Sequence, residues 1–146
     1  MNDLVSKLPK TKGQISSMND LAKYSWFQVG GPADVLFVPS DKEDLIEFIK
    51  HCPKQIPITI IGAGSNVLIR DGGINGITIL TKNLNSIKKS NKNYISVESG
   101  ALDMQISRYS QKNSLGGLEF LIGIPGSIGG GIIMNSGCFG KEIQDI

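Results

Sequence analysis

Glycine is concentrated in one short part of this 146-residue chain, because nine of its 18 glycines lie between residues 116 and 140. Three of them are consecutive, Gly129–Gly131, inside a stretch that otherwise has helical character. Each glycine in a helix costs ~1 kcal/mol relative to alanine. Three of them cost roughly 3 kcal/mol, a large part of the ~5–15 kcal/mol by which a domain is stable. This cost indicates that something flat or anionic lies against the backbone. Close packing of the helix on a sheet is the alternative explanation.

Composition predicts a folded domain in the cytoplasm. Hydrophobic residues make up 40% and charged residues 19%, with a formal net charge of +2, so we expect a packed core and no nucleic-acid partner. Cys52 and Cys138 are expected to be free thiols, with no disulfide and no metal site. The N-terminus lacks the apolar core of a signal peptide. Phe120–Gly140 has no charge over 21 residues, but its seven glycines favour a buried binding loop over a membrane helix.

Hydrophobic periodicity predicts an α+β domain with short strands. Residues 1–20 are polar, and we expect an irregular or short helical lead-in there. Ile56–Ile61 is almost wholly apolar, as in a strand buried on both faces. Asp71–Gly73 and Asn75-Gly76 are turn signals. The remaining expected elements are strands at 33–39, 67–70, 77–80 and 94–99, helices at 41–51 (with Ser40 as N-cap), 102–112 and 127–134, and a short apolar element at 118–122.

A second glycine-rich segment, Gly62–Asn66, follows the apolar strand. Its backbone N–H groups can point at one anion, and Ser65 and Asn66 can add side-chain donors. A Rossmann fingerprint would need glycine at Val67 and a helix beginning there, and no Walker A tripeptide occurs in the chain. A plain tight turn is the alternative. Together, the two glycine-rich segments favour a long ligand that carries a diphosphate, and a dinucleotide such as FAD fits better than a mononucleotide.

Groups that could do acid–base chemistry are sparse. Arg70 and Arg108 are the only arginines, so we expect phosphate binding to depend on backbone amides and only weakly on the identity of lysines and arginines. Asp103, Glu98 and Glu119 have no partner nearby in the sequence, and solvated or capping roles are expected for them. No nucleophile–base pair can be assembled from these residues.

Four motifs, read together, resemble the UDP-N-acetylenolpyruvoylglucosamine reductase family, flavoenzymes that complete UDP-N-acetylmuramate in peptidoglycan synthesis. They run in the family's order and at its spacing, over nearly the whole chain from Tyr24 onward. The motifs are Ser25–Asp34 (SWFQVGGPAD), Gly62–Gly73 (GAGSNVLIRDGG), Gly117–Gly130 (GLEFLIGIPGSIGG) and Met134–Gly140 (MNSGCFG).

The resemblance implies the FAD-binding fold of the vanillyl-alcohol-oxidase (PCMH) type, with two small α+β subdomains that grip FAD, over residues 21–146. It implies non-covalent FAD, NADPH as the hydride donor, a nucleotide-sugar substrate and no protein partner. It places the enzyme in the cytoplasm, in cell-wall biogenesis, cell shape and cell division. The implied cofactor-binding residues are Gly62, Ala63, Gly64, Ser65, Asn66 and Val67 for the diphosphate, and Ile124, Gly126, Ser127, Gly129, Gly130, Ile133, Asn135 and Gly137 for the flavin and ribityl chain.

The chain departs from the family in one side chain and in length. Phe139 stands where the family usually has tyrosine, so the hydroxyl is absent. Family members are about twice as long, and the resemblance places their catalytic arginine, serine and glutamate, with the substrate domain, in the half that would follow Ile146. We therefore expect no catalytic residue in this chain and no activity from it alone. Another FAD-dependent oxidase or dehydrogenase, a non-catalytic flavin-binding remnant, and a nucleotide-sugar-binding protein without flavin are the alternatives.

Overall fold

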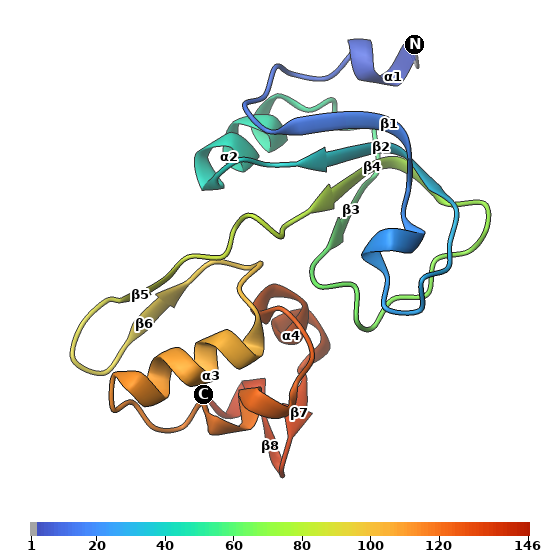
Figure 1. Cartoon of the computed structure of the whole chain (residues 1–146). Helices are drawn as coiled ribbons and strands as arrows, with labels where there is room; N and C mark the ends of the chain where they lie inside the picture. Colours follow the sequence, from blue (N-terminus) through green and yellow to red (C-terminus); the bar gives the residue numbers. More distant parts are fainter. Residues whose placement is uncertain (1–2) are drawn as a thin grey trace. The chain divides into compact units, whose positions relative to one another are not determined.

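The computed structural model describes residues 3–146 and divides the chain into two compact units. Unit 1 ends at Asn83 and unit 2 comprises Leu84–Ile146. Figure 1 shows unit 1 in blue to green and unit 2 in yellow to red. Each unit has its own hydrophobic core, and each is described separately below.

Unit 1 is built on a four-stranded mixed sheet in the order β1-β2-β4-β3 (Figure 1). Strand β1 is antiparallel to β2, whereas β2, β4 and β3 are parallel to one another. The strands are β1 (Gln14–Asp20), β2 (Pro32–Val38), β3 (Ile58–Ile61) and β4 (Ile74–Leu80), and the helices of the unit are α1 (Asp3–Ser6), the 3-10 helix η1 (Ala22–Tyr24) and α2 (Lys42–His51).

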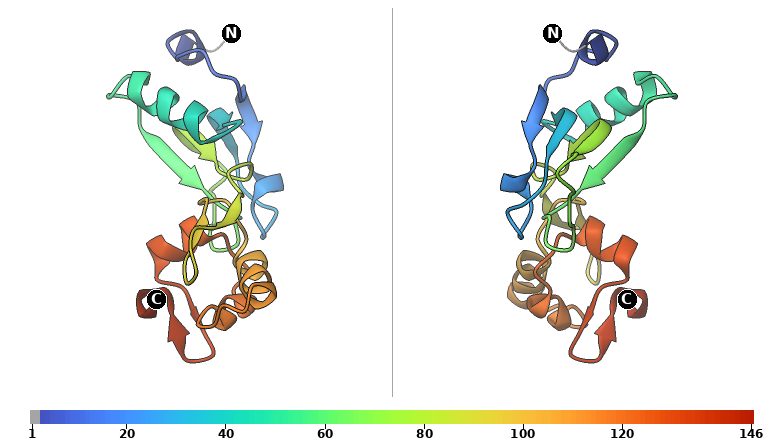
Figure 2. Two further views of the ribbon diagram at one scale, coloured as in Figure 1. Left: turned by 90° about the vertical axis from the view of Figure 1, so that its left-hand side faces the viewer. Right: turned by 90° about the vertical axis from the view of Figure 1, so that its right-hand side faces the viewer.

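The two faces of this sheet carry separate apolar clusters. Helix α2 covers one face (Figure 2), where Phe48 stacks on Phe37 with ring centroids 4.2 Å apart. Leu36 and Val38 point to the opposite face and pack with Leu21 from the segment before η1. Because alternate side chains of a strand face opposite sides, the continuous apolar run of β2 is buried on both. The predictions of this strand and of helix α2 are confirmed.

Three expectations about strands in unit 1 are wrong. The lead-in contains a strand, because Gln14–Asp20 pairs with β2 along its whole length and belongs to the sheet. Its polar sequence gave no apolar period, since it is an edge strand with mostly exposed or half-buried side chains. Strand β3 is also an edge strand, so it is not buried on both faces and Ile60 is 63% exposed. Residues 67–70 pair with no strand.

The turn expected at Asn75-Gly76 lies inside β4. Gly76 has φ +80°, and the pairing of β2 with β4 shifts register between Ala33 and Val35. Glycine is the residue that adopts this conformation without strain. The glycine therefore marks a bulge in a continuous strand and does not end it.

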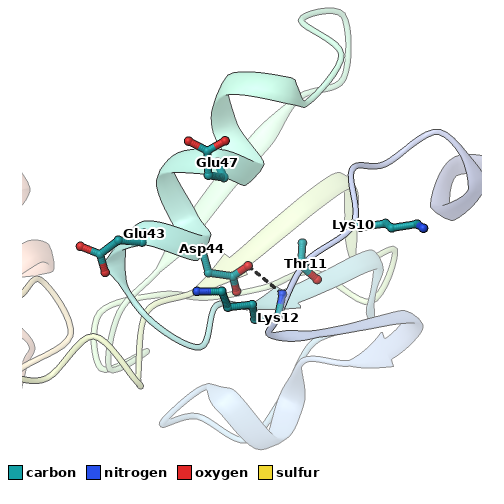
Figure 3. A pocket seen from close by; sticks show the side chains of 6 residues that line it. All are labelled: Lys10, Thr11, Lys12, Glu43, Asp44 and Glu47. Carbon is teal, nitrogen blue, oxygen red and sulfur yellow. Dashed lines mark hydrogen bonds between the residues drawn. The ribbon is translucent and has the colours of Figure 1, made fainter.

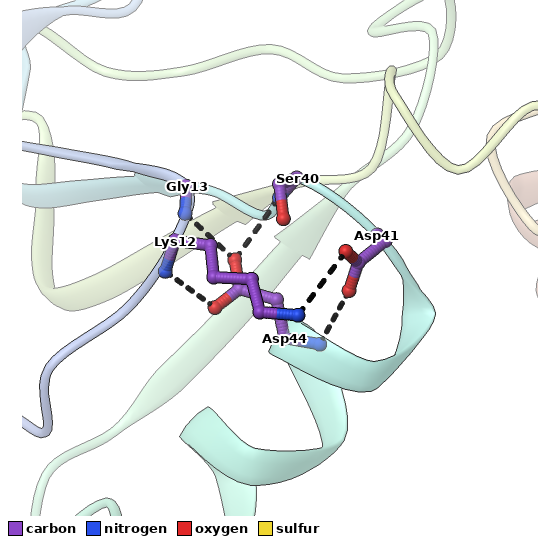
Figure 4. Close-up of polar contacts among 5 residues, drawn as sticks. All are labelled: Lys12, Gly13, Ser40, Asp41 and Asp44. Carbon is purple, nitrogen blue, oxygen red and sulfur yellow. Dashed lines mark hydrogen bonds and ion pairs between the residues drawn. The ribbon is translucent and has the colours of Figure 1, made fainter.

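Asp44 ties the segment before β1 to the start of α2 (Figure 4). Its carboxylate accepts hydrogen bonds from the backbone N–H groups of Lys12 (2.9 Å), Gly13 (2.8 Å) and Ser40 (3.0 Å). The N-cap of α2 is Asp41, whose side chain accepts from the N–H of Asp44 at 2.7 Å, so Ser40 is not the cap. Residues about 30 positions apart in the sequence are thereby held together by one buried side chain.

Unit 2 packs two α-helices, two 3-10 helices and two short hairpins around one core. The predicted helices are confirmed, and the apolar element at 118–122 is the 3-10 helix η2. The core residues are Ala101, Ile106, Phe120, Leu121 and Ile124. The elements are β5 (Ile87–Lys89), β6 (Ile95–Val97), α3 (Asp103–Lys112), η2 (Glu119–Gly123), α4 (Ile128–Met134), β7 (Gly137–Cys138), β8 (Lys141–Glu142) and η3 (Ile143–Asp145), with β5–β6 and β7–β8 paired antiparallel.

Within residues 3–146, no helix is both long enough and apolar enough to span a membrane. The uncharged run Phe120–Gly140 is divided among η2, α4 and β7.

Candidate functional site

The Gly62–Asn66 loop begins at the carboxyl end of β3, in the parallel part of the sheet of unit 1. Ligands of open α/β sheets bind at this edge. The loop is held on one side by a hydrogen bond from the N–H of Trp26 to the carbonyl of Gly64, at 3.0 Å. Five consecutive N–H groups, Ala63–Val67, donate no hydrogen bond to any residue that the structure describes. This is the backbone arrangement that an anion can use.

Gly64 is required by the fold of the loop itself. It has φ +70°, and a Cβ at this position would collide with the carbonyl oxygen of Tyr24. The space that a side chain would need at Gly64 is therefore already filled by protein backbone and is not room for a ligand. Ser65 is half-buried and Asn66 is exposed, so both side chains remain accessible beside the unbonded N–H groups.

The three glycines of α4 have different reasons to be glycine. A Cβ on Gly129 would lie 2.8 Å from the carbonyl oxygen of Ser99, and one on Gly131 would lie 2.7 Å from Cδ1 of Ile143. Packing against protein therefore explains these two, although the neighbours are a turn and the 3-10 helix η3, and not the sheet that the alternative explanation named. A Cβ on Gly130 would meet only Oγ of Ser127, at 3.7 Å. Gly130 alone of the three presents an open backbone surface.

Ser127, the N-cap of α4, is buried, and its hydroxyl has no hydrogen-bond partner. The neighbouring chain is fixed by backbone hydrogen bonds from Ile128 to Ala101 and from Gly129 to Ser99, both 2.9 Å. A buried hydroxyl without a partner is uncommon in native proteins and calls for an explanation. A ligand seated against this turn would supply one.

The expectation of a solvated or capping role for Asp103 is wrong. Asp103 is fully buried (0% exposed), and neither carboxyl oxygen has a partner, so it is neither solvated nor a cap. Burial raises its pKa from 3.8 to about 6. A Cβ on Gly131 would lie 3.7 Å from Oδ2 of Asp103, which places the carboxyl beside α4. The signal in the sequence was its position at the first residue of an amphipathic helix, between apolar neighbours.

Glu98 and Glu119 each accept a hydrogen bond from a backbone N–H group in a loop, and neither caps a helix. Glu98 accepts from the N–H of Ser86 (2.9 Å) and Glu119 from the N–H of Gly117 (2.8 Å). Cys52 is buried, and burial raises the pKa of its thiol. Both cysteines are free, and no group of three metal-ligating side chains occurs within residues 3–146.

The remaining residues implied by the resemblance lie around α4 in unit 2, with different exposures. Ile124 is buried, whereas Ile133 is 82% exposed and presents an apolar surface. Asn135 ends α4 with φ +46°, and its side chain bonds to Glu142 (2.7 Å) and to the N–H of Gln144 (3.0 Å). Asn135 therefore already has a structural role.

Two hollows elsewhere contain none of the residues implied for the cofactor. One, of about 320 Å³, lies at the start of α2 (Figure 3) and is lined by Lys10, Thr11, Lys12, Glu43, Asp44 and Glu47. Its lining mixes both signs of charge. The other, of about 420 Å³, is lined by Glu119, Phe120, Ile122, Phe139 and Lys141 in unit 2.

Each unit by itself contains a segment that suits one part of a nucleotide cofactor. Unit 1 offers unbonded N–H groups for a diphosphate at Ala63–Val67, and unit 2 offers the open surface of Gly130 and the unpartnered hydroxyl of Ser127. The fold and these two segments define a nucleotide-cofactor-binding domain of the α+β class. A family model described as an FAD binding domain matches residues 33–146, and the chain belongs to this FAD-binding-domain family.

Curated relatives identify the kind of protein that contains this domain. UDP-N-acetylenolpyruvoylglucosamine reductase of Phenylobacterium zucineum is 42% identical over 141 residues, covering 96% of this chain and 47% of the relative. The enzyme of the same name from Orientia tsutsugamushi (strain Boryong) is 45% identical over 146 residues, covering 97% of this chain and 48% of the relative. The chain thus spans about half the length of the curated relatives it matches.

Solved structures agree with the fold. UDP-N-acetylenolpyruvylglucosamine reductase from Thermus caldophilus matches with a TM-score of 0.70 and 28% identity, over 93% of this chain and 47% of that one. An alkyldihydroxyacetonephosphate synthase matches with a TM-score of 0.61 and 18% identity, over all of this chain and 31% of that one, which shows the fold alone. The expected α+β FAD-binding fold and the resemblance to the reductases over about half of their length are confirmed.

Proposed function

We propose that this chain is the FAD-binding part of a reductase that converts UDP-N-acetylglucosamine enolpyruvate to UDP-N-acetylmuramate with NADPH. The observation that carries the proposal is the run of five unbonded N–H groups at Ala63–Val67, in a chain of the FAD-binding family. The names of the relatives support the substrate and the reaction. Peptidoglycan synthesis and a cytoplasmic location belong to the same proposal.

Binding and orientation are what this chain's own residues contribute. The N–H groups of Ala63–Val67 hold the diphosphate, and the backbone at Gly130 with the hydroxyl of Ser127 meets the flavin end. Bound FAD supplies the capacity to accept and pass on a hydride. Ile133, exposed on α4, gives the flavin end an apolar neighbour. We propose in addition that residues 21–146 together form one FAD-binding domain.

Protonation of substrate needs a group within hydrogen-bond reach of the reacting carbon. Among the carboxyls that the structure describes, Asp103 has its pKa raised, to about 6, and it is fully buried and out of reach of a substrate. We therefore expect no substrate-dependent NADPH oxidation by this chain alone. Sustained turnover by the purified chain would contradict this, and turnover restored by adding the other half of a reductase would support it.

FAD titration of the purified chain tests the proposal. We expect quenching of flavin fluorescence and a shifted flavin absorbance band that saturates at one equivalent. Gly130→Leu places a side chain on the open surface of α4, where its Cβ would meet only Oγ of Ser127 at 3.7 Å, so it should weaken FAD binding by about tenfold or more, equivalent to about 1.4 kcal/mol. The matched control is Gly116→Leu in the same unit, where the only close atom is the end of the Glu119 side chain, at 3.4 Å. A chain that leaves the flavin spectrum unchanged at every concentration would overturn the proposal.

A further inference from the structure

Two lysines flank one tyrosine ring in unit 1. The Nζ atoms of Lys23 and Lys82 each lie 5.6 Å from the ring centroid of Tyr24. Lys23 belongs to η1, and Lys82 follows β4, so the fold brings together cations that are 59 positions apart. A cation near the face of a tyrosine ring is attracted by the ring's negative potential. Tyr24 therefore restricts where both exposed ammonium groups lie.

The same tyrosine is in contact with the glycine-rich loop. Its carbonyl oxygen is the atom that a Cβ on Gly64 would strike. Two residues further along the chain, the N–H of Trp26 donates a hydrogen bond to the carbonyl of Gly64. Lys23 is thus attached, through its neighbour in the chain, to the middle of the loop.

Lys82 is attached to the beginning of the loop. The residue before it, Thr81, donates from its N–H (3.1 Å) and from Oγ1 (3.4 Å) to the carbonyl of Ile61. Ile61 directly precedes Gly62. Both lysines therefore come from backbone that is hydrogen-bonded to, or packed on, the loop and the strand end that leads into it.

The segments that contact the loop carry lysines as their charged side chains, and the acid next to them in the sequence, Asp20, accepts a hydrogen bond from the N–H of Ala22 at 2.9 Å. Residues 21–25, 61–67 and 80–83 contain two lysines and no acidic residue. Backbone N–H groups carry no net charge. A diphosphate held by them alone therefore keeps its full negative charge although part of it is in contact with protein. Lysine is a compact cation suited to phosphate, and its contribution to binding falls as salt is added.

We propose that Lys23 and Lys82, positioned by Tyr24, neutralise the diphosphate of the dinucleotide bound at Ala63–Val67. This inference rests on the proposed function. It differs from the expectation drawn from the sequence, in which binding depends only weakly on the identity of lysines. The proximity of the two lysines could not be predicted, because no local pattern brings positions 23 and 82 together.

The test is FAD titration of Lys23→Gln, Lys82→Gln and the double variant, at low and at high salt. Each single change should weaken FAD binding by about fivefold at low salt, with a smaller difference at high salt. The double variant should show a flatter dependence of affinity on salt than the unmodified chain. Lys82→Arg keeps the charge and should bind nearly as the unmodified chain does. Lys54→Gln is the matched control, an exposed lysine of unit 1 outside the segments around the loop.

The outcomes separate the two proposals. Glutamine variants that bind FAD with the affinity and salt dependence of the unmodified chain would overturn this inference alone. An unmodified chain that binds no FAD would overturn the proposed function and this inference with it. Equal weakening by Lys54→Gln would mean that net charge matters and that the position beside Tyr24 does not, which also overturns the inference.

Discussion

Asp44 in unit 1 and Asp103 in unit 2 occupy similar places and have opposite environments. Each lies in the first turn of a ten-residue helix, and they are 5% and 0% exposed. Asp44 accepts three backbone N–H groups (Figure 4), whereas the oxygens of Asp103 accept none. Burial raises the pKa of both carboxyls, but for Asp44 the three N–H donors outweigh burial and the pKa falls below 3.8.

The difference gives the two carboxylates opposite effects on stability. Asp44 stabilises the fold when ionised, so its contribution is present above the unfolded pKa of 3.8 and is lost as the pH falls through the lower folded value. Asp103 is more easily ionised in the unfolded chain, so it lowers stability as the pH rises from about 4 to about 6. Buried acids that cost stability cluster at functional sites, and Asp103 lies beside α4, the helix that we propose for the flavin end.

The largest expected effect is that of Asp44→Ala. Removing the carboxylate leaves three backbone N–H groups without their acceptor and detaches the 12–13 segment from α2. Hydrogen bonds to charged groups contribute ~1.5–3 kcal/mol each and are not additive, so we expect a loss of about 3–5 kcal/mol. Chemical denaturation at pH 7 measures it. A loss below about 1 kcal/mol would mean that solvent satisfies these groups as well as Asp44 does.

Asp103→Asn should act in the opposite direction. A pKa raised from 3.8 to about 6 corresponds to about 3 kcal/mol of destabilisation above pH 7. The variant should therefore be more stable than the unmodified chain at pH 7.5, by about 3 kcal/mol more than it is at pH 3.5. Denaturation curves at the two pH values give this difference. A gain that is the same at both would show that Asp103 does not ionise within this range.

Asp41→Ala should have a smaller effect on the same helix as Asp44. It removes the N-cap hydrogen bond to the N–H of Asp44, and loss of such a cap costs ~1 kcal/mol. The exposed ion pair of Asp41 with Lys12, at 3.7 Å, should add little. Lys12→Ala, which breaks only that pair, is the control, and an equal loss from both variants would contradict the assignment of the cap.

Gly130→Ala should have the smallest effect. Gly130 lies on α4, the helix beside Asp103. The added methyl meets open space, so removing a helical glycine should raise stability by ~0.5–1 kcal/mol. Gly129→Ala is the matched comparison, and it should lose stability because its Cβ would lie 2.8 Å from the carbonyl oxygen of Ser99. Thermal unfolding of the two variants without FAD separates them. The same sign for both would show that the two positions pack alike.

Local patterns determined much of the fold. The strand at β2 and the helices α2, α3 and α4 followed from the apolar pattern, because this preference acts within a few positions of the chain, although the N-cap of α2 is Asp41 and not Ser40. The glycine-rich segments also indicated a dinucleotide before any geometry was known. The four motifs added the family, which the comparisons confirm.

Tertiary structure decided what depends on partners distant in the sequence. Strand β1 has no apolar period of its own and exists because β2 lies beside it. The reasons for glycine at positions 64, 129 and 130 differ only because different atoms face them. Whether a buried aspartate is satisfied depends on which N–H groups the fold brings to it, and so does its pKa. The sequence by itself determined the helices, the strand β2 and the kind of ligand, whereas strand β1 and the environment of each side chain came from long-range packing, which no local pattern records.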